Sequence, residues 1–124
     1  MRVLAFDLGG ERGARSLWQD YHTVTDAVVF VVDAGDRERL EEASSELWSM
    51  VATRSKEPGH NECVLLVLGN KVDRSEAASG EEIRRVLRLG ELGTEHFRAV
   101  EEFQVSLYTG AGYVEAFKWL EDHL

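Results

Sequence analysis

Several residue types are scarce in this chain, and each scarcity excludes a class of protein. A single cysteine, Cys63, excludes an internal disulfide framework and a multi-cysteine metal site. The longest apolar runs, Ala27–Val32 and Cys63–Leu68, have the length of a strand and are too short to cross a bilayer. The 14 basic residues are outnumbered by 23 acidic ones. We therefore expect no nucleic-acid partner, because phosphate contacts need clustered Lys and Arg.

The composition is that of an ordinary soluble globular domain. Hydrophobic residues make up 44% of the 124 residues and charged residues 30%. This length suits one domain, residues 1–124, and leaves no room for two. An acid at Asp7 comes too early for a secretory signal, so we expect a cytoplasmic protein.

Apolar runs and helical spacings alternate along the chain. Two runs are continuously apolar, which is typical of strands that are covered on both faces. Leu40, Leu47 and Met50 recur at helical spacing, and so do Tyr113 and Phe117. The expected strands lie near 2–7, 27–33, 63–69 and 102–107, and the expected helices near 36–54, 80–88 and 112–124. This alternation predicts an α/β fold in which helices cover both faces of a parallel sheet, giving three layers.

The most specific motif, Asn70-Lys71-Val72-Asp73, directly follows a strand. Guanine presents two adjacent donors, its ring N–H and its exocyclic amine, and the carboxylate of Asp73 can accept both. The stem of Lys71 can lie along a base face, and the Asn70 amide can bond the base or a neighbouring loop. The alternative is a turn that only ends the strand. Because ligands gather at the carboxyl ends of parallel strands, the motif predicts a nucleotide site there.

Two weaker signals also follow strands. Asp7 could reach a Mg²⁺ ion through water, and the Gly10 amide could approach a phosphate oxygen. A glycine turn after an edge strand explains the same residues. Ser106-Leu107-Tyr108 could offer backbone amides to a base carbonyl, although it also fits a plain strand end.

Taken together, these motifs resemble the Arf (ADP-ribosylation factor) family of small GTPases. Phe6–Glu11 is similar to the opening of the family's switch II, Val31–Leu40 to its fourth strand and following loop, and Leu66–Asp73 to its guanine-specificity strand. The resemblance implies binding of GTP or GDP with Mg²⁺, hydrolysis, and a vesicle-trafficking or ciliary signalling role. It also implies protein effectors or regulators that bind the switch II region. The implied nucleotide-binding residues are Asn70, Lys71, Asp73, Gly10 and Leu107, with Asp7 at the metal.

The chain departs from the family pattern in four ways. It contains no Gly-x-x-x-x-Gly-Lys-Ser/Thr phosphate loop, so we expect a small-GTPase-like topology without its first two strands and first helix. Nucleotide binding and hydrolysis should be impaired, since that loop supplies most phosphate contacts. Glu11 stands where the family has its water-positioning glutamine, and Leu107 departs from the usual base-reading motif. Arg2 replaces the glycine that myristoylation requires, so we expect no direct membrane anchor.

Three interpretations follow from the sequence. The first is an Arf-like GTP-binding protein with impaired nucleotide chemistry. The second is a non-catalytic interaction module that uses the switch II surface, and the third is a truncated gene product.

In the family, the strand before the phosphate loop lies between the strands that correspond to Met1–Asp7 and Ala27–Val32. Without it, we expect an open gap between Arg2–Phe6 and Val28–Val32 that would drive self-association through an unpaired strand edge. The alternative is that these two strands pair with each other.

Overall fold

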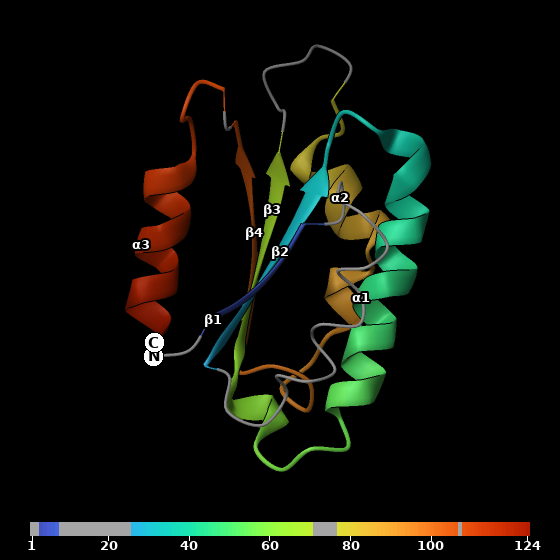
Figure 1. Ribbon diagram of the computed structural model, residues 1–124, viewed down its shortest axis with the longest axis vertical. Coiled ribbons are helices and arrows are strands. Elements are labelled where there is room, and N and C mark those ends of the chain that lie inside the picture. The colour runs from blue at the N-terminus through green and yellow to red at the C-terminus, as the bar shows by residue number, and fades with distance from the viewer. Residues whose placement is uncertain (1–2, 8–25, 71–76, 107) are drawn as a thin grey trace.

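A four-stranded parallel sheet forms the centre of the computed structural model, which describes residues 3–7, 26–70, 77–106 and 108–124 (Figure 1). The strands are β1 (Val3–Asp7), β2 (Ala27–Asp33), β3 (Val64–Asn70) and β4 (Ala99–Val105), in the spatial order β1-β2-β3-β4. The helices are α1 (Leu40–Arg54), α2 (Gly80–Val86) and α3 (Tyr113–His123). Ala27–Val32 and Val64–Leu68 lie in strands with parallel pairing, so these two predictions are confirmed, and Cys63 directly precedes β3.

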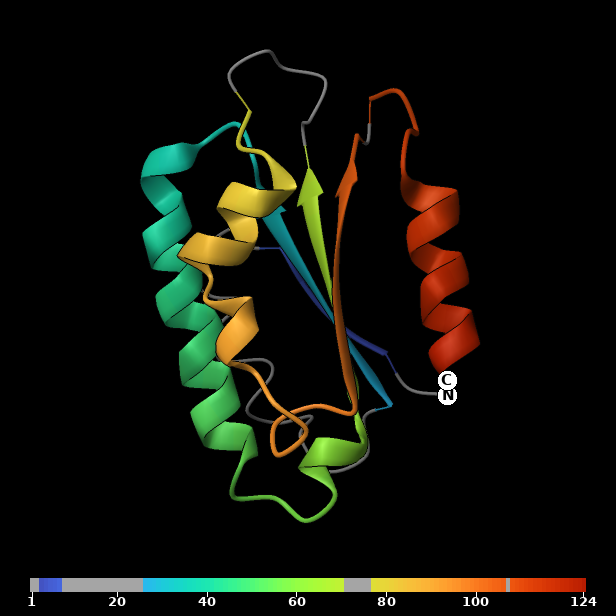
Figure 2. The same cartoon turned by 180° about the vertical axis from the view of Figure 1, so that it is seen from behind.

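Helices cover the sheet on both sides, with α1 and α2 on one face and α3 on the other (Figures 1 and 2). Alternate residues of β2 serve the two layers, because successive strand residues point to opposite faces. Val28 and Phe30 pack with Leu47 under α1, while Val29 packs with Ala116 under α3. Each large apolar side chain buried in this way contributes about 1.5–3 kcal/mol. The apolar runs are therefore explained by burial on both faces.

Direct pairing of β1 with β2 corrects the expectation of an open gap between these strands. Leu4 is in register with Val28 and Phe6 with Phe30, in parallel orientation. Pairing satisfies backbone groups that would cost about 1–3 kcal/mol each if they were buried without partners. Among the described residues, β1 then has a strand neighbour on one side only, and Val3 is 43% exposed.

Three elements differ by two residues or more from the bounds that the sequence indicated. β4 begins at Ala99 rather than 102, because Glu101 and Glu102 interrupt the apolar pattern although both belong to the strand. The first turn after Asp36 is a 3₁₀ helix, η3 (Arg37–Arg39), and the α-helix starts only at Leu40. The helix α2 stops at Val86, two residues before Arg88, whose φ is 54°.

The amino terminus of α2 is capped by Ser79. The backbone N–H of Glu82 donates to the hydroxyl of Ser79 over 3.1 Å. This bond satisfies one of the free N–H groups in the first turn and fixes where the helix begins. Across the part of the chain that the structure describes, no helix has the length and apolarity needed to cross a membrane.

Candidate functional site at the carboxyl ends of the strands

The carboxyl ends of β2, β3 and β4 lie together at one end of the sheet (Figure 1). Asp33 is in register with Asn70, and Asn70 with Val105, which precedes Ser106. The sheet therefore brings the end of β2 beside the ends of β3 and β4, the two strands at which the base-recognition residues were expected. This is the edge of an α/β sheet at which ligands bind.

Asn70 occupies the last position of β3, one residue beyond the end expected for that strand, and it is 9% exposed. Its backbone carbonyl accepts a hydrogen bond of 2.8 Å from the Ala34 N–H in the loop after β2. The parallel ladder therefore continues one residue past β2. The position of Asn70 is consequently set by two strands at once, and such fixing is what a recognition residue needs.

The carboxylate of Asp33, another strand-end acid, has a partner within its own loop. Its Oδ1 accepts a hydrogen bond of 2.9 Å from the Gly35 N–H, and its carbonyl accepts one of 3.2 Å from the Asp36 N–H. These bonds form an Asx-type turn, in which a short acidic side chain imitates a backbone turn. Asp33 therefore holds the loop that contacts Asn70.

The turn after β4 is organised around Ser106, which is 1% exposed. Its N–H donates to the Ala111 carbonyl over 3.0 Å, and its carbonyl accepts from Gly110 over 2.7 Å. Its hydroxyl accepts from the Thr109 N–H over 3.2 Å. Tyr108 is 93% exposed. These three hydrogen bonds of Ser106 close the turn that leads into α3.

Comparisons with known proteins agree with this arrangement of motifs. The model of the ADP-ribosylation factor family, Arf, matches residues 1–124. The chain belongs to the Arf family. It is similar to ADP-ribosylation factor-like protein alp41 of Schizosaccharomyces pombe, with 35% identity over all 124 residues of this chain and 63% of that protein. It is also similar to ADP-ribosylation factor-like protein 2 of Arabidopsis thaliana, with 37% identity over 93% of this chain and 59% of that protein.

A third relative gives the same proportions. ADP-ribosylation factor-like protein 3 of Saccharomyces cerevisiae is 33% identical over 96% of this chain and 58% of its own length. This Arf-family chain thus spans about 60% of the length of the curated relatives that it matches.

Several residues that the sequence singled out lie outside the described part of this Arf-family chain: Gly10, Glu11, Lys71, Asp73 and Leu107. Residues 8–25, which include Leu8–Glu11 of the stretch that resembles switch II, lie outside it as well. For Asp7 the backbone is described, and it pairs with Val31 at the end of β1.

Membership of the Arf family implies guanine nucleotide with Mg²⁺ in general. Of Asn70, Lys71 and Asp73, the structure describes Asn70, which is buried at a strand end with its backbone carbonyl bonded to the neighbouring loop. A phosphate cradle would need the glycine-rich loop whose sequence motif these 124 residues do not contain. In the described ranges, no group of three or more His, Cys, Asp or Glu side chains could hold a metal ion.

A buried acid away from the strand ends, Glu102, was not singled out by the sequence. Its side chain is 2% exposed, and its Oε1 lies 3.4 Å from Arg84 Nη2. The other carboxylate oxygen, Oε2, is buried without a hydrogen-bond partner. Burial raises the pKa of Glu102, an effect that Arg84 partly offsets and Glu101 adds to. The sequence did carry one signal for this site, which is the pair of adjacent acids, Glu101 and Glu102, in a strand-like segment.

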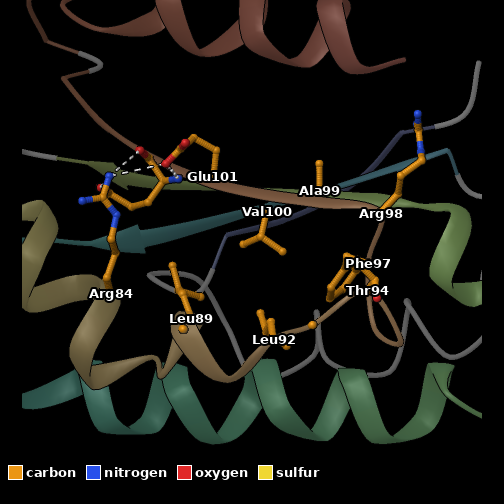
Figure 3. Close-up of a pocket in the computed structure, with 12 residues that line it drawn as sticks. Arg84, Leu89, Leu92, Thr94, Phe97, Arg98, Ala99, Val100 and Glu101 are labelled. Atoms are coloured by element: carbon orange, nitrogen blue, oxygen red, sulfur yellow. Dashed lines mark hydrogen bonds and ion pairs between the residues drawn. The ribbon is translucent and has the colours of Figure 1, made fainter.

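A pocket of about 390 Å³ lies beside this acid (Figure 3). Arg84 and Glu101 lie at one end of it and Arg98 at the other, with Leu89, Leu92, Phe97 and Val100 between them. Because Arg84 reaches both Glu101 and Glu102, which point to opposite faces of β4, its guanidinium lies across the outer edge of that strand. The pocket is thus apolar in the middle and charged at its ends.

Proposed function

We propose that this chain is an Arf-like protein that recognises guanine through Asn70, Lys71 and Asp73. The supporting observation is the buried position of Asn70 at the end of β3, with its carbonyl bonded to Ala34. The first residue of the Asn70–Asp73 motif is therefore held in place by the sheet. The cellular role would be of the vesicle-trafficking or ciliary signalling type, with protein effectors or regulators that bind the switch II segment.

We further propose that nucleotide binding and hydrolysis by these 124 residues are weak. Without the glycine-rich loop, the amide cradle and the lysine that face the terminal phosphates have no source in this sequence. At Glu11, a carboxylate would face the charge of the γ-phosphate. It also cannot donate the hydrogen bond that a glutamine amide donates. Both features lower the expected rate of hydrolysis.

Titration calorimetry with GTP and Mg²⁺ tests this proposal. We expect a Kd on the order of 0.1–1 mM, since a few base contacts of about 1–3 kcal/mol each must also offset the entropy lost on binding. ATP serves as the control and should bind more weakly still. A sub-micromolar Kd for GTP would mean that a phosphate site exists elsewhere in the chain, and the weak-binding proposal would be wrong.

The Asp73→Asn variant tests whether the carboxylate of Asp73 recognises guanine. The amide of Asn cannot accept both guanine donors, so the preference for GTP over ATP should fall toward unity. Contacts to the phosphates should stay the same, so ATP affinity should not change. If the variant keeps the wild-type preference, Asp73 does not read the base.

A second candidate function is self-association through β1. Among the described residues, this strand pairs only with β2, and Val3, Leu4 and Ala5 on its edge are apolar. A stretch of edge strand without charges or proline, such as Val3–Ala5, can recruit a second strand through its open backbone groups.

Sedimentation at several protein concentrations tests this candidate. We expect the fraction of dimer to rise with concentration, and an Ala5→Lys variant to reduce it. Lysine at an edge blocks strand addition because its charge would be buried. An Ala52→Lys variant on the exposed side of α1 is the control, since it adds the same charge away from the edge. A wild-type chain that stays monomeric at every concentration would contradict self-association.

A further inference from the structure

The two faces of the sheet are covered unequally. Among the helices that the structure describes, α1 and α2 lie on one face and α3 lies on the other (Figures 1 and 2). Strands lie about 4.8 Å apart and packed helices about 8–10 Å apart, so a face of four strands has room for two helices side by side. On its face, α3 packs mainly on β3 and β4. None of the described helices therefore covers the part of this face that lies over β1.

The apolar floor beneath α3 continues onto β1. Leu4 packs into the cluster under α1, and successive strand residues point to opposite faces, so Val3 and Ala5 lie on the α3 face. Val3 is in register with Ala27 and Ala5 with Val29, and both β2 residues are buried in the cluster beneath α3. Val3 is nevertheless 43% exposed, and Ala5 is exposed as well. The floor is thus open to solvent at β1.

The flank of α3 that faces β1 is also apolar and exposed. The opposite flank is marked by Trp119, whose ring centroid lies 6.4 Å from that of Phe103 on β4, at the far edge of the sheet from β1. Phe117 comes two residues before Trp119, about 200° around the helix, and therefore lies on the β1 side. Val114 and Leu124 fall on the same side by their helical spacing from Phe117. Val114 is 77% exposed, Phe117 49% and Leu124 43%.

Exposed hydrophobic side chains are concentrated where these two elements meet. The described residues have five large ones: Val3, Tyr108, Val114, Phe117 and Leu124. All but Tyr108 lie on β1 or on the flank of α3 that faces it, and we call these four, with Ala5, the β1–α3 surface. The start of β1 lies beside the end of α3 in both views (Figures 1 and 2). Single exposed apolar residues are common in soluble proteins, whereas a cluster of them marks an interaction site.

Charge indicates which kind of partner fits the β1–α3 surface. Glu121 is exposed on the same flank of α3, one turn before Leu124. At the end of the surface, Leu124 lines a pocket of about 220 Å³ together with Asp26, Glu62 and Arg98. The net charge of −9 repels a second copy of the chain and attracts a basic partner.

We propose that the β1–α3 surface is the docking site of a basic amphipathic helix that belongs to another protein. The apolar side of that helix covers Val3 and Phe117, and so completes the layer in which α3 lies. A lysine or arginine on its polar side pairs with Glu121. The surface shares no residue with the Asn70–Asp73 motif, so this inference goes beyond the proposed recognition of guanine and does not depend on it.

Titration with a synthetic peptide, followed on the backbone amides by NMR, tests this docking site. The probe is an amphipathic helix of about 18 residues with leucines on one side and lysines on the other. We expect it to shift the amides of Val3, Ala5, Phe117 and Leu124. The same peptide with glutamates in place of the lysines should shift none of them. Shifts confined to other residues, or equal binding of the two peptides, would overturn the proposal.

Three variants of the chain test which side chains bind the lysine peptide. Phe117→Ser should weaken binding about tenfold, because it removes apolar area at the centre of the surface. Val114→Ser should weaken it about threefold, and its 77% exposure leaves the core unaffected. Tyr108→Ser is the matched control, since Tyr108 is 93% exposed outside the surface, and it should keep the wild-type affinity. Equal affinities in all three variants would overturn the proposal.

The chain without peptide tests the other possible occupant. We expect the amides of Phe117 and Leu124 to keep the same chemical shifts at every protein concentration. If these amides shift as the concentration rises, a second copy of the chain occupies the surface, and the proposed basic partner is wrong.

Discussion

Replacing Gly112 by alanine is expected to destabilise the chain by about 3 kcal/mol. Gly112 precedes α3 with φ 84°, a left-handed conformation that costs a residue with a Cβ about 1–2 kcal/mol. A Cβ at this position would also collide with the backbone carbonyl oxygen of Gln104 on β4. Neither the strand nor the helix can move away without breaking its own hydrogen bonds, so the collision adds to the conformational cost.

Gly110, in the same turn, is the matched control for this prediction. Its φ is 77°, but a Cβ there would have no neighbour within 4 Å. We expect Gly110→Ala to cost only about 1 kcal/mol, the conformational part alone. Urea unfolding followed by circular dichroism measures both losses. If the two variants lose the same stability, close approach of Gly112 to β4 does not contribute.

Replacing Glu102 by leucine is expected to stabilise the chain by about 1–3 kcal/mol at neutral pH. The carboxylate has one oxygen that is buried without a partner, and its ion pair with Arg84 is long at 3.4 Å. Leucine removes the charge and the unpaired oxygen while filling a similar volume. Arg84 keeps Glu101 as a partner, also at 3.4 Å, so no charge is left buried and alone.

The gain from Glu102→Leu should depend on pH in a direction that the raised pKa of Glu102 sets. Because the folded state raises the pKa of Glu102, folding favours the protonated carboxyl group. Its contribution to stability is fully present below the unfolded pKa of about 4.3. That contribution is lost as the pH rises through the folded pKa. The difference between variant and wild type should therefore grow from pH 4 upward.

Glu101→Gln provides the control for both effects. The Glu101 side chain is 40% exposed, and exposed ion pairs contribute about 0–1 kcal/mol. We expect a change within about 0.5 kcal/mol and little dependence on pH. A loss of stability in Glu102→Leu at pH 7 would contradict the proposed cost of the buried acid.

The parts of the fold that could be predicted are those in which local pattern and burial agree. The strand at Ala27–Asp33 has the expected bounds, because an uninterrupted β-branched run is buried on both faces. β4 could not be bounded in this way, since Glu101 and Glu102 look like a loop while the ladder with β3 includes both. Pairing between β1 and β2 is a tertiary outcome, and no local pattern distinguishes it from an open gap.

In the candidate site, too, some features could be predicted from the sequence and others could not. The position of Asn70 at the carboxyl end of a buried strand followed from the sequence, because its motif comes directly after an apolar run. The bonds of Ala34 to Asn70 and Ala78 could not be foreseen, since they join backbone atoms of residues far apart in the chain. Glu102 was missed for a similar reason, because its burial depends on the packing of α2 against β4.

Cys63 is fully buried directly before β3, and its rate of chemical labelling can therefore report unfolding of the chain. It is the single cysteine of the sequence, and burial raises its pKa to about 11. A thiol that is both enclosed and protonated does not react with alkylating reagents. In excess reagent, the labelling rate of Cys63 will therefore measure how often β3 opens to solvent. The natural sequence permits this measurement without an introduced probe, and each variant above can be ranked by it in cell extracts as well as in buffer.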